Sequence, residues 1–537
     1  MKTKIAITTL LAAAAVCAYA APGDAPVKPP VMGWSSWNGF AVNISDSIIM
    51  NQADRLVELG LKDAGFNHVN IDDGYFGRRD ADGNMTPNPV RFPRGMKHVP
   101  EYIHSLGLKA GCYTDAGHNT CGSMWSGDPI GKGAGIYGHE EQDAQLYFGD
   151  WDFDFIKIDY CGAEELLLDE KEQYTRIAEA VAKVKPGVSI NICRWAFPGT
   201  WAKNVAASWR ISTDIRAKWE LVKLIVEKNQ NLSAYARDGH YNDMDMLVIG
   251  LHGNSAIGGD GLTETEEKAH FGMWCIMSSP LLIGADLNKL AESSLDILRN
   301  TELIAVNQDR LGRQAYPVVI NADGTAVFAK DLEELHGLRR AVAFYNPTDE
   351  EKTVTIPLAE LELGGKVKVR NLTERKDAGT FEDSFGMTLA PHSATILRMD
   401  AQKRLEPARY EAEWGYMPLF NDLGTSKAGY QPDSRCSNGW KATGLGDSRY
   451  NHISWDNVWS DKGGDYIITV NVVDSKDRRL WVDVNGKKSA EATVDADGKA
   501  SVAVPVHLEK GFNTVKFGNN STPLPDIDNF TLTKTKF

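Results

Sequence analysis

The chain has 537 residues, of which 24% are charged, and a formal net charge of −14 at pH 7. This length exceeds one ordinary domain, and an acidic chain without basic clusters argues against a nucleic-acid partner. After the first twenty residues, no run approaches the roughly 18–20 consecutive apolar residues that a membrane helix needs. We therefore expect a multidomain protein without a membrane span.

Residues 1–20 have the pattern of a secretory signal peptide. Lys2 and Lys4 precede an apolar run, and Ala18-Tyr19-Ala20 forms a cleavage site of the A-x-A type. Cys17 raises the alternative of a lipoprotein, but Val16 is a poor residue to precede a lipidated cysteine. The segment predicts soluble export to the periplasm or the extracellular space. The six other cysteines form no CxxC pairs, which gives no metal signal, and some can form disulfides after export.

Residues 21–312 alternate short apolar strands with helical stretches. We expect helices such as 45–61, 171–184 and 218–228. Strands are expected at 30–34, 68–72, 109–113, 154–159, 189–194, 207–213, 241–247 and 280–283. Eight strands alternating with helices predict a (β/α)8 TIM barrel. A doubly wound open sheet is the alternative, but no glycine-rich phosphate loop follows the first strand.

The predicted strand 154–159 carries charges where a buried strand is expected to be apolar. Lys157, Asp159 and Cys161 share one face, because strand residues two apart point the same way. Burying two opposite charges and a thiol is costly without a purpose. Taken alone, Lys157 and Asp159 are equally compatible with a catalytic role and with a buried ion pair that only fixes strand register.

The ends of the other predicted strands decide between these alternatives. In a barrel of this kind the active site lies at the carboxyl ends of the strands. Those ends hold acids, a lysine, arginines and aromatic residues: Trp37, Asp72, Asp73, Tyr113, Asp115, Lys157, Asp159, Arg194, Trp195, Arg210, Asp214, Asp243 and Asp245. Carboxylates can hold sugar hydroxyls, an indole can cover an apolar sugar face, and two carboxyl groups can cleave a glycosidic bond.

Five sequence blocks then resemble glycoside hydrolase family 27. They are Pro30-Val31-Met32-Gly33-Trp34-Ser35-Ser36-Trp37, Asn70-Ile71-Asp72-Asp73-Gly74-Tyr75, Lys157-Ile158-Asp159-Tyr160-Cys161, Tyr241-Asn242-Asp243-Met244-Asp245-Met246-Leu247 and Asn307-Gln308-Asp309. Together they span about residues 28 to 315, in the order and spacing of the family. That family holds retaining α-galactosidases and α-N-acetylgalactosaminidases, so the resemblance implies a retaining glycosidase that needs no cofactor for catalysis.

The resemblance also implies roles for individual residues. Asp159 matches the nucleophile and Asp214 the acid/base, while Cys121 and Cys161 match a disulfide beside the site. The match to sugar-binding and pocket-closing residues covers Trp37, Asp72, Asp73, Tyr113, Lys157, Arg210, Asp245 and Met246. Lys157, on the same face as Asp159, is expected to favour the charged form of the nucleophile.

The segment after the fifth strand departs from the family pattern. Galactosidases usually carry an acid or an amide where this chain has Arg194, and N-acetylgalactosaminidases carry small residues there and at the position of Phe197. Both bulky residues are expected to exclude an N-acetyl group, and Arg194 can donate to a 2-hydroxyl. We therefore expect a substrate with terminal α-galactose, with β-L-arabinopyranose or α-N-acetylgalactosamine as alternatives.

Two β-domains are expected to follow the barrel. Residues 313–400 alternate as in an antiparallel β-sandwich, and residues 401–537 are expected to form a second, jelly-roll-like β-sandwich that begins after a polar linker around residues 400–407. The start and end of the last domain resemble carbohydrate-binding modules of families 6 and 35, which implies a structural calcium at Glu411, Glu413 and Asp528. Trp440, Trp455 and Trp459 are equally compatible with a sugar platform and with a core.

The sequence thus predicts an exo-acting, retaining α-galactosidase with a carbohydrate-binding module. The alternative from a different class is a non-catalytic glycan-binding protein that keeps a degenerate barrel. The presence of Lys157, Asp159, Arg210 and Asp214 favours the enzyme.

Overall fold

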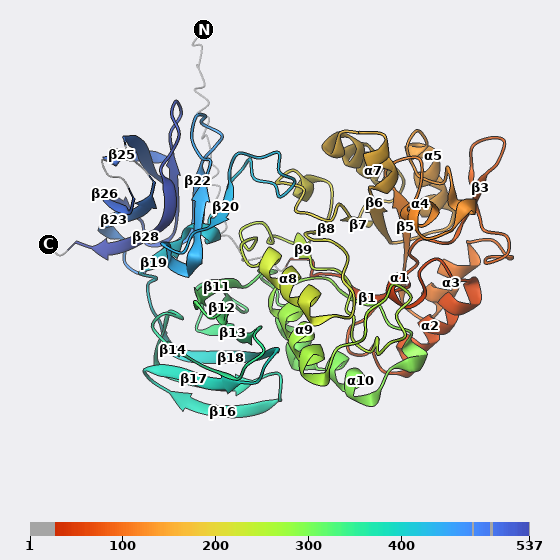
Figure 1. The fold of residues 1–537 in the computed structure, drawn as a ribbon, viewed down its shortest axis with the longest axis horizontal. Helices are drawn as coiled ribbons and strands as arrows, with labels where there is room; N and C mark the ends of the chain where they lie inside the picture. The colour runs from red at the N-terminus through yellow and green to blue at the C-terminus, as the bar shows by residue number, and fades with distance from the viewer. Residues whose placement is uncertain (1–26, 475–476, 495–497, 536–537) are drawn as a thin grey trace, which may run out of the picture.

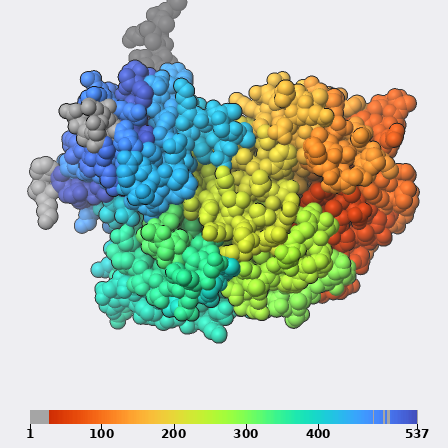
Figure 2. Space-filling model, viewed as in Figure 1, coloured from red at the N-terminus to blue at the C-terminus, as the bar shows by residue number. Residues whose placement is uncertain are grey.

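The computed structural model describes residues 27–474, 477–494 and 498–535. A barrel forms one side of the molecule, and two β-domains pack against it and against each other (Figures 1 and 2). The expected signal peptide lies outside the described residues. Within them, no helix is long and apolar enough to cross a membrane.

The barrel wall consists of eight parallel strands, which confirms the predicted fold class. In chain order they are β1 (Met32–Ser35), β2 (His68–Asn70), β5 (Lys109–Asp115), β6 (Phe155–Asp159), β7 (Ser189–Ile192), β8 (Ser208–Arg210), β9 (Tyr241–Asp243) and β10 (Leu281–Ile283). β10 pairs with β1, and a parallel bridge between Leu247 and Ile283 closes the ring beside β9. All eight predicted strands are present, although several are shorter than expected.

Helices surround the barrel between its strands. They are α1 (Trp37–Phe40), α2 (Asp46–Glu58), α3 (His98–Ser105), α4 (Cys121–Trp125), α5 (Glu140–Ala144), α6 (Cys161–Glu165), α7 (Glu170–Val184), α8 (Trp219–Asn229), α9 (Glu264–Ile276), α10 (Glu292–Leu298) and α11 (Thr301–Asn307). Side chains fix where the long helices begin: Ser45 caps α2, and Thr263 with Glu266 forms a capping box on α9. A short hairpin of β3 (Phe76–Arg79) and β4 (Met85–Pro87) follows β2.

The middle domain is an antiparallel β-sandwich. Its strands are β11 (Tyr316–Ile320), β12 (Ala326–Asp331), β13 (Arg339–Asn346), β14 (Lys352–Pro357), β15 (Leu363–Asn371), β16 (Lys376–Phe381), β17 (Ser384–Leu389) and β18 (Ser393–Arg404). β18 continues through part of the segment that was expected to be a polar linker. It does so because Arg404 pairs with Leu363 of β15 and its guanidinium forms a buried ion pair with Glu362.

The third domain is a second β-sandwich, built from β19 (Arg409–Glu411), β20 (Gly429–Pro432), β21 (Trp440–Thr443), β22 (Ile453–Ser460), β23 (Gly464–Val473), β24 (Arg478–Val484), β25 (Lys487–Val494), β26 (Ala500–Leu508), β27 (Gly511–Gly518) and β28 (Asp526–Lys534). Its first and last strands pair. Trp455 is buried in the core, and Trp459 stacks on His336 of the middle domain. These two indoles therefore do not form a sugar platform.

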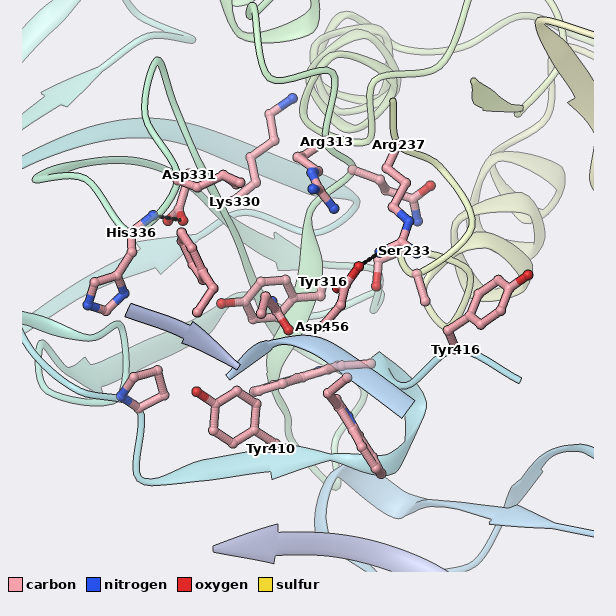
Figure 3. Close-up of a pocket in the computed structure, with 18 of the residues that line it drawn as sticks. Ser233, Arg237, Arg313, Tyr316, Lys330, Asp331, His336, Tyr410, Tyr416 and Asp456 are labelled. Atoms are coloured by element: carbon pink, nitrogen blue, oxygen red, sulfur yellow. Dashed lines mark hydrogen bonds and ion pairs between the residues drawn. The ribbon is translucent and has the colours of Figure 1, made fainter. Parts of the chain in front are cut away.

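The three domains meet around a cavity of about 100 Å³ (Figure 3). Arg237 and Arg313 come from the barrel side, Tyr316 and His336 from the middle domain, and Tyr410, Tyr416 and Asp456 from the third. Arg237 forms an ion pair with Asp456 across this junction. The third domain is thus in direct polar contact with the barrel.

Candidate active site

A pocket of about 450 Å³ opens at the carboxyl ends of the barrel strands, a volume within the usual range of small-molecule sites. Its walls combine carboxylates, cations and aromatic rings: Trp37, Asp72, Asp73, Tyr113, Cys121, Trp125, Ser126, Lys157, Asp159, Cys161, Glu164, Trp195, Asp214, Arg216 and Ile257. Seven residues predicted as catalytic or sugar-binding, from Trp37 to Asp214, lie in this one lining.

Asp159 ends strand β6 at the bottom of the pocket. Its side chain is buried, and its Oδ1 has no hydrogen-bond partner among the described residues. Burial raises the pKa of Asp159 to about 6, although the charge of Lys157 opposes the shift. Lys157 itself donates to Asp72 Oδ2 over 3.0 Å. Lys157 therefore favours the charged form of Asp159, as expected, but its direct partner is Asp72.

Asp73 is fixed beside this pair by backbone amides. Gly74 N donates to its Oδ1 over 2.7 Å, and Gly122 N donates to its Oδ2 over 2.6 Å. A Cβ at position 122 would lie 2.6 Å from Asp73 Oδ2, so this close approach requires glycine. Burial nevertheless raises the pKa of Asp73 to about 7. Gly122 follows Cys121, whose disulfide to Cys161 joins the loop after β5 to the loop after β6.

Asp214 lies at the rim of the same pocket, with more than half of its side chain exposed. Burial of the carboxyl would raise its pKa, but the charges of Arg210 and Lys157 outweigh burial and lower the pKa below its ordinary value. Arg210 donates to Asp214 Oδ1 over 3.2 Å and lies 2.9 Å from Asp245 Oδ2. Arg210 therefore links the carboxylate of Asp214 at the rim to the carboxylate of Asp245 inside the barrel.

Arg210, Asp245 and Met246 lie deeper than the other predicted site residues. They line a smaller adjoining cavity, which shares Asp72 and Lys157 with the open pocket. Asp245 Oδ2 accepts from Ile215 N over 2.8 Å. In this structure Asp245 thus supports the segment that carries Asp214 and does not face the open pocket.

The structure places two predicted residues of the loop after β7 outside the pocket lining. Arg194 is not in the pocket lining: its Nε lies 2.6 Å from Glu170 Oε1, and its guanidinium stacks over Tyr160. Its Nη2 lies 3.5 Å from Oε1 of Glu164, which does line the pocket. Phe197 is fully buried and packs on Phe420 of the third domain. Neither side chain is part of the pocket lining, so the structure gives no support to their expected contact with the sugar 2-position. Trp195, between them, is the residue of this loop in the lining.

Several lining residues were not among the predicted sugar-binding set. Trp125 is 75% exposed at the pocket mouth, an unusual position for an indole, and Ser126, Glu164, Arg216 and Ile257 complete the rim. Arg216 lies two residues after Asp214, and this short spacing could have placed Arg216 at the pocket from the sequence. Ile257 belongs to a long irregular loop after β9, where no periodicity marks its position.

The comparisons with known proteins agree with this geometry. Residues 29–309 match the model of the family described as alpha galactosidase A, and residues 322–399 match the alpha galactosidase C-terminal beta sandwich domain. A probable alpha-galactosidase of Dictyostelium discoideum is 35% identical over 398 residues, which cover 73% of this chain and 97% of that protein.

Solved structures give the same result. A putative alpha-galactosidase/melibiase from Bacteroides fragilis is 34% identical, with a TM-score of 0.62, and the match covers 70% of this chain and 80% of that one. An alpha-galactosidase from Saccharomyces cerevisiae, solved with raffinose, is 25% identical, with a TM-score of 0.59 and coverage of 69% and 97%. Both family matches end before the third domain begins.

A (β/α)8 barrel with paired carboxylates at the carboxyl ends of its strands is an arrangement that glycoside hydrolases use, and the family matches assign the chain to that class. The extent of the family match allows a narrower statement. The chain belongs to the α-galactosidase family, glycoside hydrolase family 27.

Proposed function

We propose that this protein is an exo-acting, retaining α-galactosidase in which Asp159 is the nucleophile and Asp214 the acid/base. The observation that carries the proposal is the position of these two carboxylates in one pocket, with Asp159 buried at its bottom and Asp214 at its rim. A retaining glycosidase needs one ionised and one protonated carboxyl group on either side of the scissile bond.

The reaction then proceeds in two displacements. Asp159 attacks the anomeric carbon while Asp214 gives its proton to the glycosidic oxygen, and the alcohol leaves. Asp214 next removes a proton from water, which attacks the galactosyl ester and releases galactose and the Asp159 carboxylate. The net configuration at the anomeric carbon is retained.

The other pocket residues support binding of the galactose unit. Asp72 and Asp73 offer acceptors to sugar hydroxyls, Lys157 offers a donor, and Trp37 and Tyr113 offer apolar ring faces. Since Arg194 and Phe197 lie outside the lining, the preference for galactose over the N-acetylated sugar depends on the remaining wall, which includes Trp195. Terminal α-galactose is the substrate that we propose.

A nitrophenyl α-galactoside assay tests this function. Asp159→Ala should lower kcat by about 10³-fold or more, and azide should rescue it by attacking in place of the missing carboxylate. Nuclear magnetic resonance should show α-galactose as the first sugar released by the wild type. Asp238→Asn, at an exposed acid of the same domain, should remain fully active. Equal activity of Asp159→Ala and wild type would overturn the nucleophile assignment.

We propose further that the enzyme is exported. The Cys121–Cys161 disulfide suits an oxidising compartment, and the basic and apolar pattern of residues 1–20 suits a cleaved signal. Mass spectrometry of the protein recovered outside the cytoplasm should give an N-terminus after Ala20. Recovery of full-length protein in the cytoplasmic fraction alone would contradict export.

A calcium ion at Glu411, Glu413 and Asp528 is also part of the proposal. All three carboxylates are buried. Burial raises the pKa of Glu411 to about 7 and holds the pKa of Glu413 well above its ordinary value. Glu413 Oε2 has no hydrogen-bond partner among the described residues. One hydroxyl, Ser437 Oγ, lies within 2.7 Å of both Glu411 Oε2 and Asp528 Oδ1, so its single proton serves two acceptors.

This oxygen-only set fits a hard cation in its chemistry. In the described part of the chain, however, the three carboxylates are not gathered within 4.8 Å of one another, so they must move closer together to bind an ion. Calcium should raise the melting temperature of the dialysed protein, and Glu413→Gln should remove that increase. A melting temperature that does not respond to calcium or to a chelator would exclude the site.

A further inference from the structure

The loop that follows β7 forms one wall of the catalytic pocket. This wall loop, residues 193–201, contains Trp195 in the pocket lining. Trp195 has a φ of 62°, which is uncommon for a residue with a side chain and persists only where the surroundings hold it. What holds the wall loop in place therefore affects the shape of the site.

A segment of the third domain packs on the outer side of the wall loop. This docking segment, residues 415–422, lies between β19 and β20, in the part of the third domain that extends toward β7 and β8 in Figure 1. The rings of Phe420 and Phe197 are stacked, with centroids 5.5 Å apart and an interplanar angle of 19°. Both side chains are buried, so the stack forms an apolar core between the domains.

Hydrogen bonds fix the same contact at both ends. Asp422 N donates to Phe197 O over 2.9 Å, and Thr200 Oγ1 donates to Pro418 O over 2.7 Å. The first bond joins the two backbones directly, and the second joins the Thr200 side chain to the backbone of the docking segment. Their directions are opposite, one donor coming from each domain, which fixes register as well as distance.

Tyr235 of the barrel extends the contact beneath the stack. Its ring lies 4.7 Å from that of Phe197 and 5.6 Å from that of Phe420, and its hydroxyl accepts from Met417 N over 3.1 Å. Phe197 is therefore enclosed by Tyr235 and Trp209 of the barrel and by Phe420 of the third domain. At the junction itself, Tyr416 lies beside Arg237, as Figure 3 shows.

We propose that Phe420 is a positioning residue for the active site: through Phe197 it holds the wall loop, and with it Trp195, in the pocket. The third domain thereby completes the sugar-binding pocket of the barrel. The effect on catalysis rests on the proposed galactosidase function, whereas the effect on the loop does not.

The experiment compares neighbouring substitutions in the full-length chain. Phe420→Ala should raise KM for nitrophenyl α-galactoside roughly five- to tenfold, because the wall loses its fixed position, while kcat stays within about twofold since Asp159 and Asp214 do not move. Phe420→Leu, which keeps an apolar side chain in place, should restore most of the affinity. Leu419→Ala is the matched control, because Leu419 is 51% exposed next to Phe420.

Hydrogen–deuterium exchange gives a readout that is independent of activity. Amides of residues 193–201 should exchange faster in Phe420→Ala than in wild type and in Leu419→Ala, while amides of β6 should keep their protection. Thr200→Val, which removes the bond to Pro418 from the barrel side, should change KM and exchange in the same direction and serves if Phe420→Ala does not fold.

The outcomes separate the two proposals. If the wild type were inactive but the wall loop still exchanged faster in Phe420→Ala than in wild type, the positioning role of Phe420 would stand and the galactosidase function would be contradicted. Unchanged KM and unchanged exchange in a folded Phe420→Ala or Thr200→Val protein would overturn the proposal that Phe420 positions the wall loop. Equal effects of Phe420→Ala and Leu419→Ala would also overturn it, because they would indicate a general disturbance of the third domain.

Discussion

Lys157 and Asp72 form an ion pair across the bottom of the pocket, with 3.0 Å between Nζ and Oδ2. They come from strands that are not neighbours, because β5 lies between β2 and β6. The ammonium also lies over the ring of Tyr113, which β5 supplies, 5.5 Å from its centroid. Three strands thus place one cation on Asp72, a proposed sugar-binding acid, where its charge also acts on Asp159, the proposed nucleophile.

Replacing Lys157 by methionine should change both the rate and its pH dependence. Asp72 would remain buried without its partner, so kcat/KM should fall at least about 30-fold, which corresponds to about 2 kcal/mol. Because Lys157 lowers the pKa of Asp159, its removal should raise that pKa above about 6 and move the alkaline limb of the profile to higher pH. Lys183→Met, at an exposed lysine, is the control and should leave the profile unchanged.

The two carboxylates predict an acidic optimum. The active enzyme holds one proton on the pair, on Asp214, with Asp159 ionised. The higher pKa belongs to Asp159, at about 6, and that of Asp214 is lowered. Most singly protonated molecules therefore carry the proton on Asp159, and the active form is a minor species in equilibrium with them. As the pH rises through about 6, the pair of carboxyl groups loses its last proton, so no acid remains to protonate the leaving group. Well below pH 6, the pair binds a second proton, which neutralises the nucleophile.

Measured kcat/KM should therefore be highest below about pH 6 and fall about tenfold per unit on the alkaline side. A dinitrophenyl galactoside needs no proton for its leaving group, so its alkaline limb should disappear. A maximum above pH 7 with the mononitrophenyl substrate would contradict this assignment of the proton.

The barrel and its site could be predicted because regular spacing controls both. Period-two strands alternating with helices determine the fold, and parallel strands bring their carboxyl ends together, which gathers Asp72, Lys157 and Asp159. Side-chain direction in irregular loops has no such rule. Arg194 turns toward Glu170 on α7, and Phe197 turns toward Phe420, more than two hundred residues away in the chain. These partners are apparent only in the folded chain.

The position of Arg194 gives a prediction opposite to that from the sequence. Arg194→Ala should change kcat/KM for nitrophenyl α-galactoside less than about threefold and cost about 1 kcal/mol of stability or less, since its ion pair with Glu170 is partly exposed. Trp195→Ala should raise KM much more, because that indole lines the pocket. If Arg194→Ala lowered kcat/KM more than tenfold for the galactoside but not for its 2-deoxy analogue, the result would show that Arg194 contacts the 2-hydroxyl of the sugar.

The Cys121–Cys161 disulfide should support both stability and substrate binding. It closes a loop with a sequence separation of 40, for which chain entropy predicts about 4 kcal/mol of stabilisation. Both cysteines also line the pocket, and the amide of Gly122 that fixes Asp73 directly follows Cys121. The double variant Cys121→Ala/Cys161→Ala should therefore melt several degrees lower and bind the galactoside more weakly, as measured by thermal unfolding and by KM. Cys436→Ala, at a free cysteine of the third domain, is the control and should leave KM unchanged. A double variant with a lower melting temperature but an unaltered KM would show that the bond stabilises the barrel without shaping the site.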